Sequence, residues 1–316
     1  MLNTCLVYRS YGLPAKCLNL ENRELPPVAE GHLRVAVSYA PVNPSDLIPI
    51  TGAYPHRIQL PSIAGYEAVG TVIAAPQEYS ALVGRRVLPV RGAGTWQKYI
   101  DCDPRVAVPV PDFIPDLVAA RSYINPLASL MMLDQWQVKG RHVLLCGAGS
   151  TCADILGRWA LQHGATTVSG IYRTESRVPG LLGHGIEPIS VNDTQAVIGA
   201  ARHADIAFDS VGGPAGNAVL DAMRPETVFV GYGLLSGKSV SVSQNAQARY
   251  RRFHLRDYIS KMSEAAWQDN FLRIWPALAR HDWPETDTFK MSDWKCAINQ
   301  TLRQGAPKPL LYFGHG

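Results

Sequence analysis

Short apolar runs bounded by glycine and proline fill the first part of the chain. Clear examples lie at residues 33–42, 67–75 and 84–90, and the first residues alternate between apolar and polar side chains at the two-residue period of a strand. This pattern predicts a compact, mostly β module that extends from Leu2 to about Pro111.

The pattern changes to helical spacing after this module. Apolar residues recur every three or four positions between Asp116 and Gln137, and the Asn125-Pro126 step within this stretch predicts two helices or one kinked helix. From residue 142 to residue 233, buried strands that end in glycine or a polar residue alternate with helices. This alternation predicts a parallel, doubly wound sheet with ligands at the carboxyl ends of its strands.

The last part of the chain is expected to be helical and then to return to the first module. Residues 244–281 are rich in aromatic side chains and are predicted to form helices, and the apolar run at residues 307–314 predicts a returning strand. The one local basic cluster extends from Arg249 to Arg256. It is interpreted either as a dock for phosphates of a cofactor, coenzyme A or carrier protein, or as a solvated helix face.

The composition indicates a folded protein of about two domains. The chain has 316 residues, is 47% hydrophobic, and carries a net charge of +4 from 30 Lys and Arg against 26 Asp and Glu. So small and dispersed a basic excess argues against a nucleic-acid or membrane-surface partner. The six cysteines form no Cys-x-x-Cys pair and no signal peptide is visible, so we expect reduced thiols and a cytoplasmic location.

A glycine-containing turn follows the strand that begins at residue 142. Gly147 and Gly149 allow the backbone to approach a pyrophosphate, which would lie on the N–H groups of the next helix. Cys152 stands where the third glycine of such a turn is expected. We predict that Gly147, Gly149, Ser150 and Thr151 bind the phosphates of a dinucleotide; a glycine turn without a ligand is the alternative.

The next strand ends in Tyr172 and Arg173, where an NAD-binding fold places an acidic residue on the ribose 2′-hydroxyl. An arginine suits a 2′-phosphate, which it can bind through two parallel hydrogen bonds. Arg177 lies close by, and Glu175 is beyond the expected strand end. The pattern therefore favours NADPH over NADH.

Two loops of the first module, rich in proline and glycine, carry polar side chains. Asn43, Asp46, Tyr54 and Glu67 are the residues of interest. On their chemistry alone they form either the polar wall of an active site or ordinary turns, and turns are the simpler interpretation.

An ordered series of short motifs runs over nearly the whole chain. It consists of NPSD, GAYP, P-x-x-x-G-Y-E-x-x-G, GRRV, GTWQKY and INPLASLMML, followed by GAGSTCA, IYR, FDSVGG and GYGLLSG. In this order the motifs resemble the medium-chain dehydrogenase/reductase superfamily, and within it the zinc-independent quinone oxidoreductases and 2-enoyl-thioester reductases. The resemblance implies an α/β fold with a GroES-like β-rich catalytic domain (1–120 and 268–316), a Rossmann NADPH-binding domain (121–267), and the active site in the cleft between them.

The resemblance also implies a site without metal. Zinc-dependent members carry a cysteine near the position of Asn43 and a Gly-His-Glu where this chain has Gly65-Tyr66-Glu67. Neither replacement suits a tetrahedral zinc site. Without a metal Lewis acid, reduction of an activated C=C bond becomes the expected chemistry.

Roles for individual residues follow from the same resemblance. Tyr54 matches the tyrosine that is the proposed proton donor of the enoyl-reductase branch, and a phenol of pKa about 10 can protonate the far more basic enolate that hydride addition leaves. Asn43 would line the nicotinamide end of the cleft, and Asp46 would orient neighbouring polar groups. Further cofactor contacts are expected from Ser129, Gly231, Tyr232 and Gly233.

Three functions stay open from the sequence. The leading hypothesis is NADPH-dependent, metal-free reduction of an enoyl thioester, carried by coenzyme A or a carrier protein, or of an enone. The second is an NADPH:quinone oxidoreductase, in which Tyr54 only positions substrate or cofactor. The third is a non-catalytic NADPH-binding protein. The resemblance also implies a homodimer.

Overall fold

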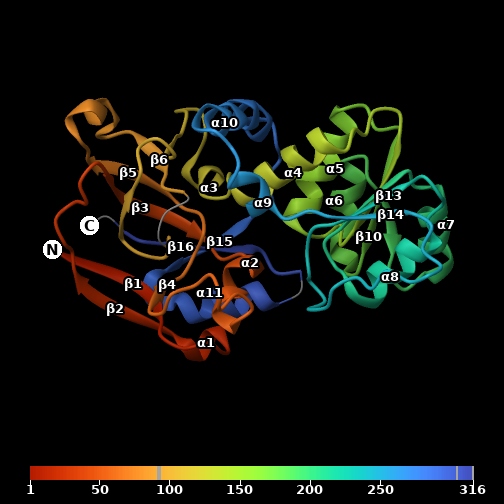
Figure 1. Ribbon diagram of the computed structural model, residues 1–316, viewed down its shortest axis with the longest axis horizontal. Coiled ribbons are helices and arrows are strands. Elements are labelled where there is room, and N and C mark those ends of the chain that lie inside the picture. Colours follow the sequence, from red (N-terminus) through yellow and green to blue (C-terminus); the bar gives the residue numbers. More distant parts are fainter. Residues whose placement is uncertain (91–93, 304, 315–316) are drawn as a thin grey trace. The chain divides into compact units, whose positions relative to one another are not determined.

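The computed structural model describes residues 1–90, 94–303 and 305–314 and divides into two units (Figure 1). Unit 1 comprises residues 1–124 and 262–316, and unit 2 comprises residues 125–261. The domain limits expected from the sequence, after residues 120 and 267, differ from these by a few positions. Each unit is described by itself.

Unit 1 is built on mostly antiparallel strands. Among its described residues, a seven-stranded sheet has the order β15-β16-β3-β5-β6-β8 with β7 paired to β3, and a three-stranded sheet has the order β2-β1-β4. The strands are β1 (Leu2–Tyr8), β2 (Leu18–Glu24), β3 (Leu33–Pro41), β4 (Ser62–Ile63), β5 (Val69–Ala74), β6 (Arg86–Leu88), β7 (Tyr99–Cys102), β8 (Val108–Pro109), β15 (Thr286–Lys290) and β16 (Lys308–Tyr312). The β module predicted for the start of the chain is confirmed.

Helices of unit 1 pack around these sheets. The longest is α10, and α11 lies directly before β16. They are α1 (Pro14–Cys17), α2 (Pro44–Leu47), α3 (Asp116–Ala119), α10 (Glu264–Ala279) and α11 (Trp294–Leu302), with 3-10 turns at Pro49–Thr51, Gln77–Leu82 and Met291–Asp293.

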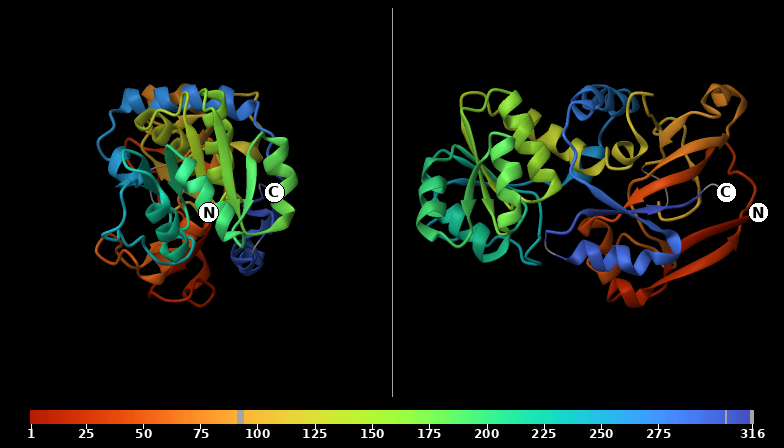
Figure 2. Two further views of the ribbon diagram at one scale, coloured as in Figure 1. Left: turned by 90° about the vertical axis from the view of Figure 1, so that its right-hand side faces the viewer. Right: turned by 180° about the vertical axis from the view of Figure 1, so that it is seen from behind.

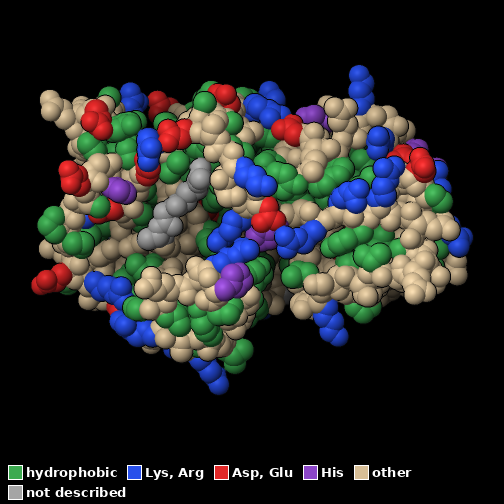
Figure 3. Space-filling model, viewed as in Figure 1, with side chains coloured by type: hydrophobic (Ala, Val, Ile, Leu, Met, Phe, Trp, Pro, Cys, Tyr) green, Lys and Arg blue, Asp and Glu red, His purple; other side chains and the backbone are tan. Residues whose placement is uncertain are grey.

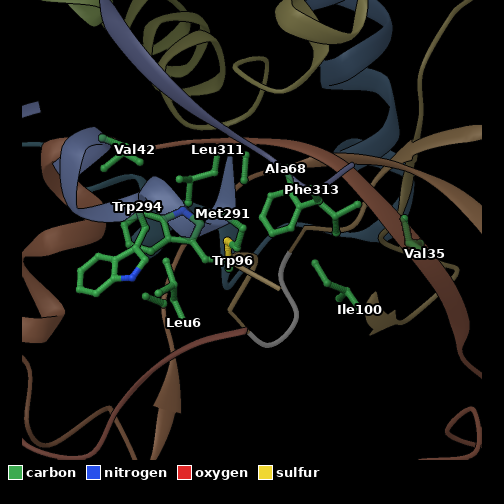
Figure 4. Close-up of a cluster of buried hydrophobic side chains, with 14 of the residues drawn as sticks. Leu6, Val35, Val42, Ala68, Trp96, Ile100, Met291, Trp294, Leu311 and Phe313 are labelled. Carbon is green, nitrogen blue, oxygen red and sulfur yellow. The ribbon is translucent and has the colours of Figure 1, made fainter. Parts of the chain in front are cut away.

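The core of unit 1 joins the two ends of the chain around Trp96. The Trp96 side chain is fully buried, and its indole Nε1 donates to the Pro41 carbonyl over 3.1 Å. Figure 4 shows Leu6 from the first strand close to Met291 and Trp294 from the C-terminal part. Burying side chains from both ends in one cluster is what makes residues 262–314 part of this unit.

The returning strand predicted for the C-terminal run is also confirmed. β16 pairs antiparallel with β3, with Leu310 opposite Pro41 and Tyr312 opposite Tyr39. β16 is not an edge strand of the sheet, because β15 pairs with its other side.

Unit 2 contains a parallel sheet, as the alternation of strands and helices predicts. Its described residues form six strands in the order β11-β10-β9-β12-β13-β14, and every neighbouring pair is parallel. The elements are α4 (Ile124–Gln135, whose first residue belongs to unit 1), β9 (His142–Cys146), α5 (Thr151–Gln162), β10 (Thr167–Tyr172), α6 (Val178–Gly183), β11 (Glu187–Ser190), α7 (Thr194–His203), β12 (Ile206–Asp209), α8 (Gly213–Ala222), β13 (Val228–Gly231), β14 (Arg249–Arg252) and α9 (Leu255–Ile259).

Helices cover both faces of this sheet (Figure 2). Leu144 and Ile171 belong to the apolar cluster that includes side chains of α7 and α8. Leu145 and Val168 face the other way, toward Gly157 of α5. Cover on both faces explains why the strands read as nearly continuous apolar runs.

The helical prediction for residues 244–281 is wrong at its start. Arg249–Arg252 form β14, the edge strand beside β13, and helices begin only at α9. The Tyr250 ring packs tilted against Phe229 with ring centroids 6.1 Å apart, while the arginines on either side are exposed. The basic cluster therefore begins on a sheet edge, where a guanidinium N–H of Arg251 donates to the Tyr250 carbonyl over 3.1 Å.

The stretch that contains Asn125-Pro126 forms two helices, as one of the two alternatives predicts, but they are separated at residues 120–123, before this step. α3 ends at Ala119, and α4 begins at Ile124, so that Pro126 lies in its first turn. A proline is tolerated there because its missing N–H would have no acceptor within the helix.

Charge and apolar surface are mixed on the molecule. On the face shown in Figure 3, Lys and Arg side chains lie scattered among apolar and acidic ones. Within the part of the chain that the structure describes, no helix is both long and apolar enough to span a membrane.

Two glycine substitutions are expected to change stability in opposite directions. A methyl group on Gly70 of β5 would lie 2.3 Å from the Ala36 carbonyl oxygen, so Gly70→Ala should lower the free energy of unfolding by about 1–3 kcal/mol. Gly199 of α7 faces open space, so Gly199→Ala should raise it by about 0.5–1 kcal/mol. Urea unfolding of both variants checks this, and a stable Gly70→Ala protein would contradict the close approach of β3 and β5.

Candidate functional site

Asp46 ties together two loops of unit 1. It occupies the first turn of α2, and its Oδ2 accepts the Asn43 backbone N–H over 2.7 Å. Its Oδ1 accepts the Tyr66 backbone N–H over 3.0 Å. The proline after Asn43 sets the backbone for a helix start, which is why this turn forms here. Both oxygens of Asp46 are thus engaged by backbone.

Asn43 and Glu67 extend this arrangement into a buried network. The Asn43 Nδ2 donates to Glu67 Oε1 over 2.7 Å, and the Lys308 ammonium donates to Asn43 Oδ1. Glu67 Oε2 accepts the backbone N–H groups of Tyr123, over 3.2 Å, and Ile124, over 3.0 Å. Glu67 therefore caps the start of α4, where a carboxylate stabilises the free N–H groups of a helix.

Burial dominates the electrostatics of the two carboxyl groups. Asp46 is 2% exposed and Glu67 is 1% exposed. Loss of solvation raises the pKa of Asp46 to about 7 and also raises the pKa of Glu67. The nearby Lys308 ammonium acts in the opposite direction on both pKa values.

Tyr54 has a different environment from Asn43 and Asp46. It is partly exposed on the loop after Gly52, whose φ of +87° is a conformation that favours glycine. The Arg57 guanidinium lies 5.8 Å from the Tyr54 ring centroid, and the Tyr54 hydroxyl makes no hydrogen bond to the described residues. Of the three predicted catalytic residues, the structure buries Asn43 and Asp46 and leaves Tyr54 accessible.

A second tyrosine supports the Tyr54 loop, and sequence reasoning missed it. The Tyr11 hydroxyl donates to the Ile58 carbonyl over 3.1 Å, and a methyl group on Gly52 would lie 3.1 Å from Tyr11 Cβ. Tyr11 thus contacts the loop both before Tyr54, at Gly52, and after it, at Ile58. Its place in the sequence, more than forty positions before Ile58, carries no signal of this contact.

In unit 2 the turn between β9 and α5 has the geometry of a phosphate loop. Gly147 has a φ of +77°, and a methyl group there would lie 2.5 Å from Ser210 Oγ. Ser150 is the N-cap of α5, and its Oγ accepts the Ala153 N–H over 3.3 Å. Thr151 is the first residue of α5. The predicted residues therefore lie together at a helix N-terminus, where anions bind readily.

Cys152, at the place of the third glycine, packs against Ser129 of α4. The Ser129 Oγ lies 3.3 Å from the Cys152 carbonyl oxygen and 3.6 Å from its sulfur, and Ser129 is fully buried. The close approach of helix and sheet occurs instead at Gly157, where a methyl group would lie 2.7 Å from Leu145 Cδ1. A glycine inside a helical pattern is the signal that points to such an approach.

The end of β10 carries two arginines beside the phosphate loop. Arg173 is exposed, and neither Arg173 nor Arg177 forms an ion pair with the described residues. The Arg177 Cγ lies 3.1 Å from where a Gly149 methyl group would be. The Tyr172 hydroxyl donates to the Glu175 carboxylate over 3.1 Å, so that Glu175 is already engaged.

The Gly231-Tyr232-Gly233 turn follows β13. A methyl group on Gly233 would lie 2.6 Å from the Ser210 carbonyl oxygen, which explains the glycine. The Tyr232 hydroxyl oxygen is buried and makes no hydrogen bond to the residues that the structure describes. Burial raises the pKa of Tyr232 well above its usual value, so the hydroxyl keeps its proton and can donate it to a ligand.

No group of three or more His, Cys, Asp or Glu among residues 1–90, 94–303 and 305–314 has the arrangement of a metal site.

Comparison with known proteins agrees with the fold of both units. Residues 29–112 match the family model of the alcohol dehydrogenase GroES-like domain. The mitochondrial enoyl-acyl-carrier-protein reductase of Arabidopsis thaliana is 29% identical over 81% of this chain and 72% of its own length.

Two solved structures extend the comparison to the whole chain. A Bacillus thuringiensis protein assigned as an NADPH:quinone reductase is 30% identical, covers 99% of this chain and 100% of its own, and has a TM-score of 0.91. The complex of Etr1p with NADP and crotonyl-CoA shares the fold, with a TM-score of 0.85, 16% identity and coverage of 99% and 100%.

The full-length match at 30% identity and the GroES-like segment agree with the two units described above. The resemblance drawn from the ordered motifs is thereby confirmed, including the α/β fold with a GroES-like β-rich domain and a six-stranded parallel sheet. The chain belongs to the medium-chain dehydrogenase/reductase superfamily, and its relatives are enoyl reductases and NADPH:quinone reductases.

Proposed function

We propose that the protein is an NADPH-dependent reductase of an activated C=C bond, in an enoyl thioester or an enone. The observation that carries this proposal is the state of Tyr54, an accessible phenol whose hydroxyl is not committed to any described residue. A group that must give up a proton during a reaction is best kept free of competing acceptors.

The phosphate loop of unit 2 fits a dinucleotide. Gly147 and Gly149 leave the backbone without side chains where a pyrophosphate would lie, and α5 presents its N-terminus there. Arg173 is exposed and Arg177 lies beside Gly149, so both could bind a 2′-phosphate, whereas Glu175 already accepts a hydrogen bond from Tyr172. NADPH, when bound, supplies a hydride to the β-carbon of the substrate.

Tyr54 then completes the reduction. Addition of hydride leaves an enolate, which is far more basic than a phenolate. The Tyr54 hydroxyl transfers its proton to the α-carbon, and the phenolate takes a proton from water. The glycine and proline on either side of the tyrosine, together with Tyr11, fix the loop that carries this group.

Relatives support this substrate class. The Arabidopsis relative is named for reduction of an enoyl group on an acyl carrier protein, and Etr1p was solved with crotonyl-CoA. A thioester carried by coenzyme A or by a carrier protein is therefore the first substrate to test.

Quinone reduction is the second candidate, because the Bacillus relative is assigned as an NADPH:quinone reductase. In that reaction no proton donor is needed and Tyr54 serves for positioning. The decrease of NADPH absorbance with enoyl-CoA, enone and quinone substrates separates the two activities, and absence of turnover with all of them favours a non-catalytic NADPH-binding protein.

The homodimer and the cytoplasmic location stay predictions. The Arabidopsis relative is named as mitochondrial, so the compartment requires direct localisation of this protein. Sedimentation of the purified protein measures its oligomeric state.

Substitution of the predicted proton donor should lower turnover of an enoyl substrate. Tyr54→Phe removes the hydroxyl, so kcat should fall by about 100- to 10,000-fold while the affinity for NADPH is retained. Tyr99→Phe, which removes a hydroxyl from β7, serves as the matched control. Full turnover of Tyr54→Phe on an enoyl substrate would rule out the proton-donor role.

Loss of the arginine at the end of β10 should discriminate between cofactors. A charged hydrogen bond to the 2′-phosphate contributes about 1.5–3 kcal/mol, so Arg173→Ala should weaken NADPH binding by about 10- to 150-fold and leave NADH binding nearly unchanged. Titration calorimetry measures both constants, with Arg202→Ala on α7 as the control. Equal losses for the two cofactors would refute the assignment.

A further inference from the structure

The buried network of unit 1 contains a cation that comes from the far end of the chain. Lys308 is the first residue of β16, and the Val42 N–H donates to the Pro309 carbonyl over 3.0 Å, which brings the lysine beside Asn43. Its ammonium donates to Asn43 Oδ1, and Asn43 Nδ2 donates to Glu67 Oε1. The lysine therefore determines which way round the Asn43 amide lies, because its oxygen must face the ammonium and its nitrogen the carboxylate.

Charges in this network are nearly all shielded from water. Asn43, Asp46 and Glu67 are at most 3% exposed, and Lys308 is half-buried. Two buried carboxyl groups repel each other when both are ionised, and the charge of Glu67 indeed raises the pKa of Asp46. Each carboxyl group also accepts hydrogen bonds from backbone N–H groups: Asp46 from Asn43 and Tyr66, and Glu67 from the start of α4.

Among residues 1–90, 94–303 and 305–314, Arg121 is a second cation that Glu67 acts on, but its hydrogen bonds go to backbone carbonyls elsewhere. Its Nε donates to the Leu117 carbonyl over 2.8 Å, and its guanidinium carbon lies 4.5 Å from the Trp283 ring centroid. Burial lowers the pKa of Arg121 to about 10, and Glu67 acts on it only through its charge. Lys308 is thus the cation that is hydrogen-bonded into the network.

We propose that Lys308 is a positioning residue of the reductase site: its ammonium is the internal counter-ion of Asp46 and Glu67 and fixes the Asn43 amide between them. Asp46 holds α2, which leads through Gly52 to Tyr54, and Glu67 holds the start of α4. The lysine thereby sets the loop that carries the proposed proton donor. The part concerning Tyr54 rests on the proposed function, whereas the counter-ion role does not.

Removal of the Lys308 ammonium should make the free energy of unfolding decrease more strongly with rising pH. The folded-state pKa of Asp46, about 7, is above the ordinary 3.8, so its protonated form stabilises the fold at low pH and this contribution is lost as pH rises through about 7. The lysine lowers both carboxyl pKa values. Without it, these pKa values rise further and stability continues to fall above pH 7.

The experiment compares Lys308→Met and Lys308→Arg with the wild type by thermal unfolding between pH 5 and pH 9. Lys290→Met is the matched control, since Lys290 is an exposed lysine on the neighbouring strand β15. The Tm loss of Lys308→Met should be about twice as large at pH 8 as at pH 5. Lys308→Arg should keep the wild-type pH profile, and Lys290→Met should show one small shift at every pH.

Two results would overturn the counter-ion role. One is an equal Tm loss of Lys308→Met at every pH, as expected of a lysine that only packs. The other is a pH-dependent loss in Lys308→Arg like that of the methionine variant. If Lys308→Met does not fold at pH 8, it should fold at pH 5, because a proton on a carboxyl group then replaces the ammonium; failure at both values also overturns the proposal.

Turnover tests the positioning role separately. Lys308→Met should lower kcat for an enoyl substrate more at pH 8 than at pH 6 and leave KM for NADPH unchanged, and Lys308→Arg should restore kcat. Equal kcat in all three proteins would overturn positioning. A wild-type protein without reductase activity would reject the proposed function. The counter-ion role would still be decided by the Tm values, because thermal unfolding needs no substrate.

Discussion

The hydrogen bonds of Glu67 are the constraint on which the arrangement of unit 1 depends. A fully buried carboxylate is unfavourable unless each of its oxygens has donors. One oxygen takes the Asn43 amide, and the other takes two backbone N–H groups at the start of α4. The Asn43 loop and the start of α4 are therefore bound to the same side chain, and a change in one of them must be accommodated by the other.

In unit 2, close packing at glycines adds to the hydrogen bonds of a buried carboxyl group, Asp209, which accepts the N–H groups of Val211 and Gly212. Gly147 and Gly233 each bring backbone against Ser210, one through its hydroxyl and the other through its carbonyl oxygen. Gly157 lets α5 lie close to β9. Close packing of this kind costs no desolvation, but it tolerates no added methyl group where the neighbour is backbone.

Sequence patterns predicted the fold well and the site only in part. Alternation of strands and helices, and the order of the motifs, were enough for both kinds of sheet and for the superfamily. The hydrogen bond between Lys308 and Asn43 was not predictable, because the two residues lie 265 positions apart and the sequence around Lys308 predicts only a strand. β14 was mistaken for helix because its short run of arginines has no apolar alternation, and its pairing with β13 comes from tertiary structure. Among the residues predicted to bind a cofactor, Gly147 and Gly233 both approach Ser210, because the turns that carry them follow the neighbouring strands β9 and β13 on either side of β12.

The composition of unit 1 from both ends of the chain has a consequence for folding during synthesis. Residues 125–261 leave the ribosome as one continuous segment and can form the parallel sheet at once. Residues 1–124 emerge earlier but lack β16, which pairs with residues 39–41 of β3, until residues 308–312 have been made. The end of β3 and the half-built core around Trp96 thus stay open until then, and it is the nascent first module, rather than the parallel sheet of unit 2, that has most need of a chaperone.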